Sequence, residues 1–193
     1  LLQVTPYYNK TTQRGLVKHF FAVADAVDKP IILYNVPSRT GVNIKPETCA
    51  ELAKHERICA IKEASGSISA VAEIRYHCGD ALDVYSGNDD QIVPILSLGG
   101  KGVISVLSNL LPQETHKICA DFFAGNVKAA SDAQIQYLPL IGSLFCEVNP
   151  IPVKEAMHLL GFCDREIRLP LCEMEEKNLE RLAGDMRKAG LHF

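Results

Sequence analysis

The stretch "ICAIKEASG", residues 58–66, decides the fold class, because it has the form of a buried strand that ends in a polar loop. The apolar run 58–61 fits the interior of a parallel sheet, and Lys62 and Glu63 follow where such a strand ends. Four other short apolar runs are likewise bounded by proline or glycine. They lie at residues 1–6, 30–37, 82–87 and 100–106. The pattern therefore predicts about five strands.

Helical patterns fill the gaps between these strands. Segment 12–27 places Leu16, Phe20, Val23 and Val27 on one face, as an amphipathic helix requires. Further helices are expected at residues 46–55, 67–78 and 90–99. Alternation of strands and helices implies parallel strands joined by right-handed crossovers.

Two α/β folds have this alternation, the doubly wound sheet and the (β/α)8 barrel. No G-x-G-x-x-G motif or P-loop follows any strand, which argues against the nucleotide-binding sheet. A barrel needs eight strands and about 250 residues. We therefore expect the C-terminal part of a (β/α)8 barrel at residues 1–124, from the end of its fourth strand through its eighth helix. A C-terminal α-helical region is expected at 125–193.

Composition points to a small-molecule partner. The net charge is −3, from 20 basic and 23 acidic residues, so a nucleic-acid partner is not expected. No apolar run approaches the ~18 residues of a membrane span, so no membrane partner is expected either. The seven cysteines form no C-x-x-C pair, which argues against zinc or a disulfide framework and suits the cytoplasm.

Polar residues at the predicted strand ends suggest carbonyl chemistry. Because side chains alternate along strands, Tyr34 and Lys62 should meet at one end of neighbouring strands, while Glu63 points the other way. A desolvated lysine has a lowered pKa, and its neutral amine forms a Schiff base with a ketone. A tyrosine phenol is a competent proton shuttle, and Arg39 is suited to bind a carboxylate.

Each of these three residues also has an ordinary explanation. A lysine at a strand end often reaches solvent or pairs with an acid, and a tyrosine often packs in the core. Arg39 could be a surface charge. The residues alone leave both interpretations open.

A resemblance favours the catalytic interpretation. The segment "YNVPSRTGVNI" (34–44) and, thirteen residues later, "ICAIKEASG" resemble the dihydrodipicolinate synthase family. This family belongs to the Schiff-base pyruvate aldolase superfamily, which includes N-acetylneuraminate lyase. Further similar segments follow in the matching order: "VTPYYNK" (4–10), "SGND" (86–89), "GGKGVISV" (99–106) and "NPIPVKEAMHLLG" (149–161).

The resemblance implies an enzyme, a carbon–oxygen lyase of the class I pyruvate aldolase type. It would condense pyruvate with L-aspartate 4-semialdehyde to 4-hydroxy-tetrahydrodipicolinate, in diaminopimelate and lysine biosynthesis. Lys62 would be the Schiff-base residue and Tyr34 the proton shuttle. Tyr8 would be a catalytic tyrosine lent across a dimer interface.

The same resemblance implies the binding residues and the assembly. Arg39 would bind the carboxylate of the aldehyde, and Gly87 and Ile104 would line the pyruvate pocket. Tyr7 would lie near the site of the inhibitor lysine. The family implies no metal or organic cofactor and a homotetramer built as a dimer of dimers.

Two alternatives stay open at this point. One is another aldolase of the superfamily, acting on a sugar-acid aldehyde, and the other is a non-catalytic truncated chain. The chain begins at Leu1 without a methionine and in mid-strand. We therefore expect an N-terminally truncated barrel that lacks part of the proton relay and is inactive by itself.

Overall fold

The computed structural model describes residues 1–193 and divides into two compact units, Leu1–Ile104 and Ser105–Phe193. Each unit is described by itself. The expected division into residues 1–124 and 125–193 stays a prediction.

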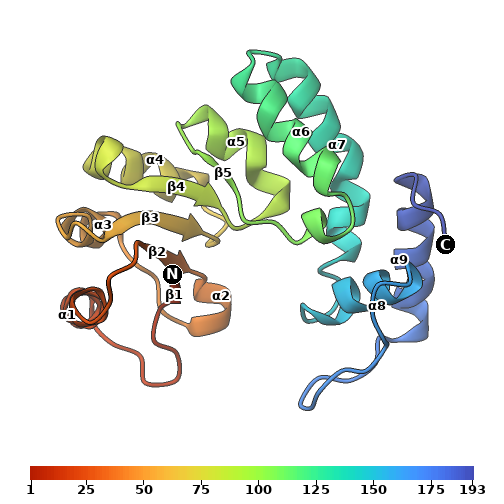
Figure 1. Ribbon diagram of the computed structural model, residues 1–193, viewed down its shortest axis with the longest axis horizontal. Coiled ribbons are helices and arrows are strands. Elements are labelled where there is room, and N and C mark those ends of the chain that lie inside the picture. The colour runs from red at the N-terminus through yellow and green to blue at the C-terminus, as the bar shows by residue number, and fades with distance from the viewer. The chain divides into compact units, whose positions relative to one another are not determined.

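The first unit is built around a parallel sheet whose strands lie in chain order (Figure 1). The strands are β1 (Leu2–Val4), β2 (Ile31–Asn35), β3 (Ile58–Glu63), β4 (Asp83–Ser86) and β5 (Gly102–Val103). The connections contain α1 (Gln13–Asp25), α2 (Pro37–Thr40), α3 (Pro46–Leu52), α4 (Ile68–Cys78) and α5 (Ile92–Ser97), with 3-10 turns η1 (Gly79–Ala81) and η2 (Asp89–Gln91). Five parallel strands with intervening helices confirm the predicted α/β class.

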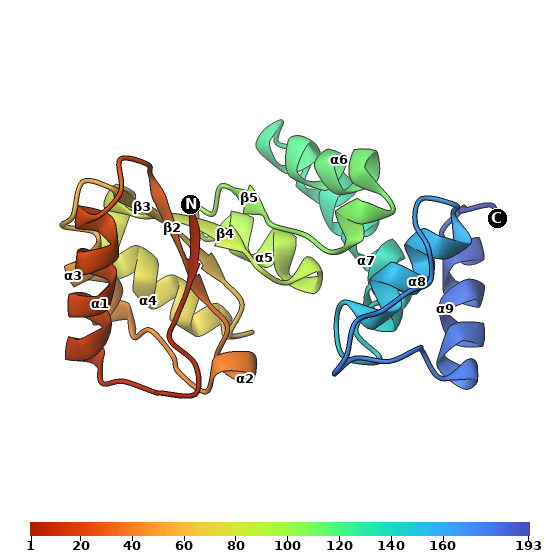
Figure 2. The same cartoon turned by 60° about the horizontal axis from the view of Figure 1, so that its bottom comes forward.

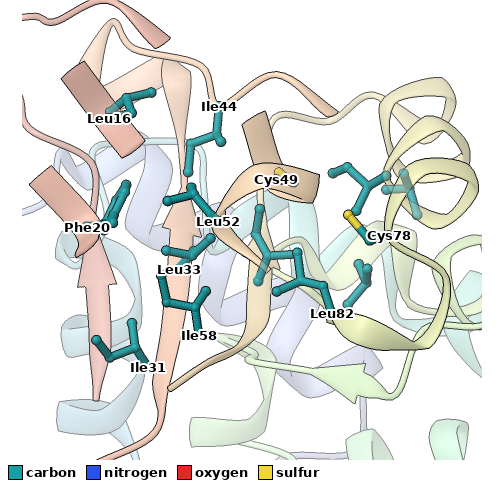
Figure 3. Packing of buried hydrophobic residues seen from close by; sticks show 14 of the residues in the cluster. Leu16, Phe20, Ile31, Leu33, Ile44, Cys49, Leu52, Ile58, Cys78 and Leu82 are labelled. Carbon is teal, nitrogen blue, oxygen red and sulfur yellow. The ribbon is translucent and has the colours of Figure 1, made fainter. Parts of the chain in front are cut away.

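One face of the sheet is covered by α1, α3 and α4 (Figures 1 and 2). Figure 3 shows Leu16 and Phe20 of α1 and Leu52 of α3 packing towards Leu33 of β2. All four side chains are fully buried, and each such burial contributes roughly 1.5–3 kcal/mol relative to exposure. This apolar layer holds the strands in register.

Side-chain caps begin two of these helices. The Thr12 hydroxyl accepts a hydrogen bond from Gly15 N at the start of α1, and the Ser67 hydroxyl accepts one from Ala70 N at the start of α4. Such caps satisfy backbone donors that have no partner within the helix. They fix where each crossover turns back along the sheet.

The opposite face of the sheet carries three half-buried polar side chains, those of Tyr34, Lys62 and Tyr85. Pairing places Tyr34 beside Lys62 and Lys62 beside Tyr85. Because side chains alternate, these three residues share one face, while Leu33 and Ile61 point into the helix-covered core. The side chains with candidate chemical roles thus lie on the face of the sheet that α1, α3 and α4 do not cover.

The second unit is helical, as predicted. It contains η3 (Leu107–Asn109), α6 (Pro112–Phe123), α7 (Val127–Ser143), α8 (Ile151–Leu159) and α9 (Glu176–Lys188). Within it, the buried Ser143 hydroxyl of α7 donates to Asp185 Oδ2 of α9 at 2.7 Å. None of the helices in either unit combines the length and the apolar character that crossing a membrane demands.

Candidate active site

Lys62 and Tyr34 meet near the carboxyl ends of β3 and β2. They are register partners in the parallel pair, and Lys62 Nζ lies 4.3 Å from the centroid of the Tyr34 ring. Both side chains are half-buried. The predicted proximity of these two residues is therefore confirmed, and so is the opposite orientation of Glu63, which is buried on the helix-covered side.

Burial lowers the pKa of the Lys62 ammonium below its usual value, because a charge loses hydration in this pocket. The positive charge of Arg39 lowers this pKa further, and the negative charge of Asp89 raises it in opposition. The net shift makes a neutral amine more accessible at a given pH. A neutral amine is the form that attacks a carbonyl carbon.

Burial raises the pKa of the Tyr34 phenol, against the opposing effect of Arg39. The phenol therefore keeps its proton at neutral pH and stands beside an amine that gives up its proton more readily than usual. A protonated phenol next to an amine with a lowered pKa is suited to exchange protons with a bound substrate.

Arg39 lies on the short helix α2, immediately after β2. Pro37 begins the helix, and Gly41 ends it in the left-handed region at φ +67°, with its N–H bonded to Pro37 O at 2.8 Å. The Arg39 side chain is exposed, while its charge acts on the pKa values of both Lys62 and Tyr34. A guanidinium at this place can be reached by a carboxylate that arrives from solvent.

Gly87 follows β4 and borders Lys62. A Cβ atom at this position would lie 2.6 Å from Ala64 Cβ and 3.2 Å from Lys62 Cε. Only glycine therefore leaves room for the Lys62 side chain in its present position. Ile104 follows β5, the strand next to β4, and its N–H donates to Ser86 O at 2.8 Å.

Tyr7 and Tyr8 lie on the loop after β1, and their exposed fractions are 66% and 91%. Neither side chain is therefore packed into the site of its own chain. Tyr8 adopts φ 55°, a left-handed conformation that costs a non-glycine residue roughly 1–2 kcal/mol. Of the residues expected at the site, the structure brings together Lys62, Tyr34, Arg39 and Gly87.

This chain is similar to known proteins over nearly its whole length. The family model described as the dihydrodipicolinate synthetase family matches residues 1–189. The chain belongs to this family. A 4-hydroxy-tetrahydrodipicolinate synthase of Caldicellulosiruptor saccharolyticus is 63% identical over 193 residues, which cover 100% of this chain and 65% of that protein. The 4-hydroxy-tetrahydrodipicolinate synthase 1 of Clostridium acetobutylicum is 56% identical over 191 residues, 99% of this chain and 65% of that protein.

Solved structures agree with this assignment. The dihydrodipicolinate synthase of Thermotoga maritima has a TM-score of 0.95 at 42% identity, and that of Aquifex aeolicus has a TM-score of 0.96 at 43% identity. In both cases the match covers 98% of this chain and 65% of the other. The fold is thus the C-terminal part of a (β/α)8 barrel with helices beyond it, as predicted. The chain spans about two thirds of the length of the relatives that it matches.

The dihydrodipicolinate synthetase fold also reveals a residue to which the sequence assigned no role. Asp89 follows β4 in the segment "SGND", is only 2% exposed, and acts on the pKa of Lys62. A carboxylate in the polar loop two residues after Gly87 was the signal that the sequence offered. Its meaning depended on the distance to Lys62, which only the folded chain supplies.

Proposed function

We propose that this chain carries the Schiff-base site of an enzyme that condenses pyruvate with L-aspartate 4-semialdehyde to 4-hydroxy-tetrahydrodipicolinate. The observation that carries the proposal is the pairing of Lys62 with Tyr34, in which the lysine pKa is lowered and the phenol pKa is raised. The names of the relatives support the choice of substrates. The reaction belongs to diaminopimelate and lysine biosynthesis.

Lys62 acts as the nucleophile in the first half of this reaction. Its neutral amine forms a bond to C2 of pyruvate, and the carbonyl oxygen takes up a proton to give a carbinolamine. Tyr34 exchanges the protons of this step and of the loss of water that follows. The product is an imine between Lys62 and pyruvate.

The imine then loses a proton from the pyruvate methyl group and becomes an enamine. The enamine carbon bonds to the aldehyde carbon of aspartate semialdehyde, and the aldehyde oxygen becomes a hydroxyl by taking up a proton. The amino group of the second substrate next attacks the imine carbon, closes the ring and displaces the Lys62 amine. The ammonium of the second substrate loses its protons in this ring closure, one of them to the departing Lys62 amine, so that one water and one proton are released overall.

The remaining residues bind the substrates. Arg39 holds the carboxylate of the aldehyde by paired hydrogen bonds, a role that its exposed position on α2 supports. Gly87 and Ile104 line the pyruvate pocket. The closeness of a Gly87 substituent to Lys62 Cε supports this placement.

The two exposed tyrosines belong to interfaces in this proposal. Tyr8 reaches the site of a second copy, and its exposure and left-handed backbone suit a side chain held out for a partner. Tyr7 borders the site of the inhibitor lysine. The enzyme is a cytoplasmic homotetramer, a dimer of dimers.

Turnover tests the choice of aldehyde. The polypeptide that contains these residues should consume pyruvate with aspartate semialdehyde, and Arg39→Ala should raise the KM of this aldehyde by about tenfold or more. Arg14→Ala, on the exposed side of α1, is the matched control and should leave KM unchanged. Full activity of Arg39→Ala, or preference for a sugar-acid aldehyde, would overturn the substrate assignment.

A further inference from the structure

Two polar side chains lie buried directly behind the site. Asn35 follows Tyr34 on β2, Glu63 follows Lys62 on β3, and the two are register partners. Their exposed fractions are 1% and 2%, on the face that the helices cover. Burial of an amide and a carboxyl group in an apolar layer is costly unless each is hydrogen-bonded. Packing alone would therefore not favour this polar pair at these two positions.

The Asn35 amide uses both of its donor hydrogens and its oxygen. Its Nδ2 donates to Glu63 Oε2 and to Asn43 Oδ1, each at 2.8 Å. Its Oδ1 accepts from Ile44 N at 3.0 Å. An amide supplies two donors and an acceptor at one position, which neither a carboxylate nor an aliphatic side chain does.

These bonds close the loop that carries Arg39. Residues 36–44 leave β2, form α2, and return so that Asn43 and Ile44 bond to the residue where the strand ended. Gln13 of α1 holds the same loop from the other side, because its Nε2 donates to Asn43 O at 2.8 Å. Closure at both ends limits the positions that Arg39 can adopt.

Glu63 fixes the other half of the network. Its Oε1 accepts from Ser65 N at 2.6 Å, and its main-chain oxygen accepts from Gly87 N at 2.7 Å. Glu63, the residue next to Lys62, is thus bonded to the residue that follows β4 and to the loop that follows β3. Through Asn35, a single amide connects the strand that bears Lys62 with the loop that bears Arg39.

We propose that Asn35 and Glu63 are positioning residues that fix Arg39 relative to Lys62, and so determine how well the site binds an aldehyde that bears a carboxylate. The inference rests on the proposed function, which assigns the Schiff base to Lys62 and the carboxylate to Arg39. Neither Asn35 nor Glu63 touches substrate. Their effect is large because the paired hydrogen bonds between a guanidinium and a carboxylate require both groups to be correctly placed.

Asn35→Asp is the first test. The substitution keeps the size of the side chain, removes both donors and places a second carboxylate against Glu63. We expect the KM of aspartate semialdehyde to rise at least about tenfold. Labelling of Lys62 by pyruvate and borohydride should stay within about threefold, because Arg39 is assigned to the aldehyde and keeps its charge in this variant. Amide exchange at Ile44 should become faster, since its acceptor is displaced.

Glu63→Gln is the second test, and it keeps the proposal testable if Asn35→Asp does not fold. The new amide accepts from only one of Asn35 and Ser65, so one buried donor loses its partner. We expect the same rise in KM for the aldehyde. Unchanged KM in a folded Glu63→Gln protein would overturn the inference.

The double variant Asn35→Asp with Glu63→Gln reverses the polarity of the network. The new amide at 63 donates to the new carboxylate at 35 and still accepts from Ser65 N, while Asn43 turns its amide over to become the donor. We expect KM to return to within about threefold of the original value. A rescue of this kind is not expected if the two residues only support stability.

Ser143→Ala is the matched control, because it removes a buried hydrogen bond to Asp185 in the other unit. It should lower the melting temperature and leave KM unchanged. A comparable rise of KM in this control, or failure of the folded double variant to recover, would refute the positioning role. An original protein that is not labelled at Lys62 would instead refute the proposed function, and this inference with it.

Discussion

Lys62 and Tyr34 face each other across neighbouring parallel strands, with the amine nitrogen 4.3 Å from the centroid of the phenol ring. The pKa of each side chain differs from that of the free side chain, in the direction that Schiff-base chemistry needs. The lysine pKa falls and the tyrosine pKa rises, in each case chiefly because burial disfavours the charged form. One half-buried space thus holds a nucleophile and a proton donor.

The pH dependence of Lys62 labelling should follow its two charged neighbours in opposite directions. Asp89 raises the lysine pKa and Arg39 lowers it. Asp89→Asn should therefore move the rise of the labelling rate to lower pH, and Arg39→Ala should move it to higher pH. The measurement is the rate of pyruvate-dependent reductive labelling over a pH series. Shifts in the same direction for both variants would contradict this account.

Lys62→Met should stabilise the fold while it abolishes labelling. Because the folded-state pKa lies below the unfolded value of 10.5, the lysine charge destabilises the folded state at neutral pH. The gain from Lys62→Met should be full below the folded pKa and shrink as the pH rises towards 10.5. Thermal melts at several pH values measure it.

Lys101→Met provides the control for that comparison. Lys101 is exposed and lies 4.0 Å from Asp83, a weak surface pair. Its replacement should change the free energy of unfolding by about 0.5 kcal/mol or less. Equal effects of the two substitutions would show that the Lys62 charge carries no burial cost.

Gly87→Ala should damage both stability and the site. The added Cβ would stand 2.6 Å from Ala64 Cβ and 3.2 Å from Lys62 Cε, so the backbone must shift and Lys62 must adjust, at a cost of about 1–3 kcal/mol. Labelling of Lys62 should slow as well. Gly184→Ala in α9 meets no atom within 4 Å and should be neutral or stabilising by up to about 1 kcal/mol. Similar unfolding midpoints for both variants would contradict the packing argument.

Tyr8→Gly should separate local strain from function. Glycine adopts φ 55° without penalty, so the unfolding free energy of the chain should rise by roughly 1 kcal/mol. Turnover should nevertheless fall, because the side chain that we assign to the neighbouring site is absent. Retention of full turnover would show that the exposed tyrosine has no catalytic role.

Much of the fold could be predicted because its signals are local. The apolar runs around Leu33 and Ile61 and the helical face of Leu16 and Phe20 each identify an element within a few residues. The meeting of Tyr34 and Lys62 followed from alternation along strands. These features depend on periodicity, which the sequence displays directly.

Other features depend on contacts between distant residues and were not predicted. Strand β5 is limited to Gly102–Val103, although the apolar pattern extends over residues 100–106. Helix α2, which carries Arg39, is a single turn, and the loop after it returns to Asn35, which donates to Asn43 and accepts from Ile44 N. The effect of Asp89 on Lys62 also requires the folded geometry. No local sequence pattern predicts a hydrogen bond between residues eight or more positions apart.

The most direct measurement is the site of covalent trapping. The polypeptide that contains these residues is incubated with pyruvate, reduced with borohydride, digested and analysed by mass spectrometry, with Lys101→Arg and Lys62→Arg as paired variants. The account predicts one reduced pyruvyl group on Lys62, retained in Lys101→Arg and lost in Lys62→Arg. Labelling of a different lysine, or no labelling of the unsubstituted protein, would contradict it.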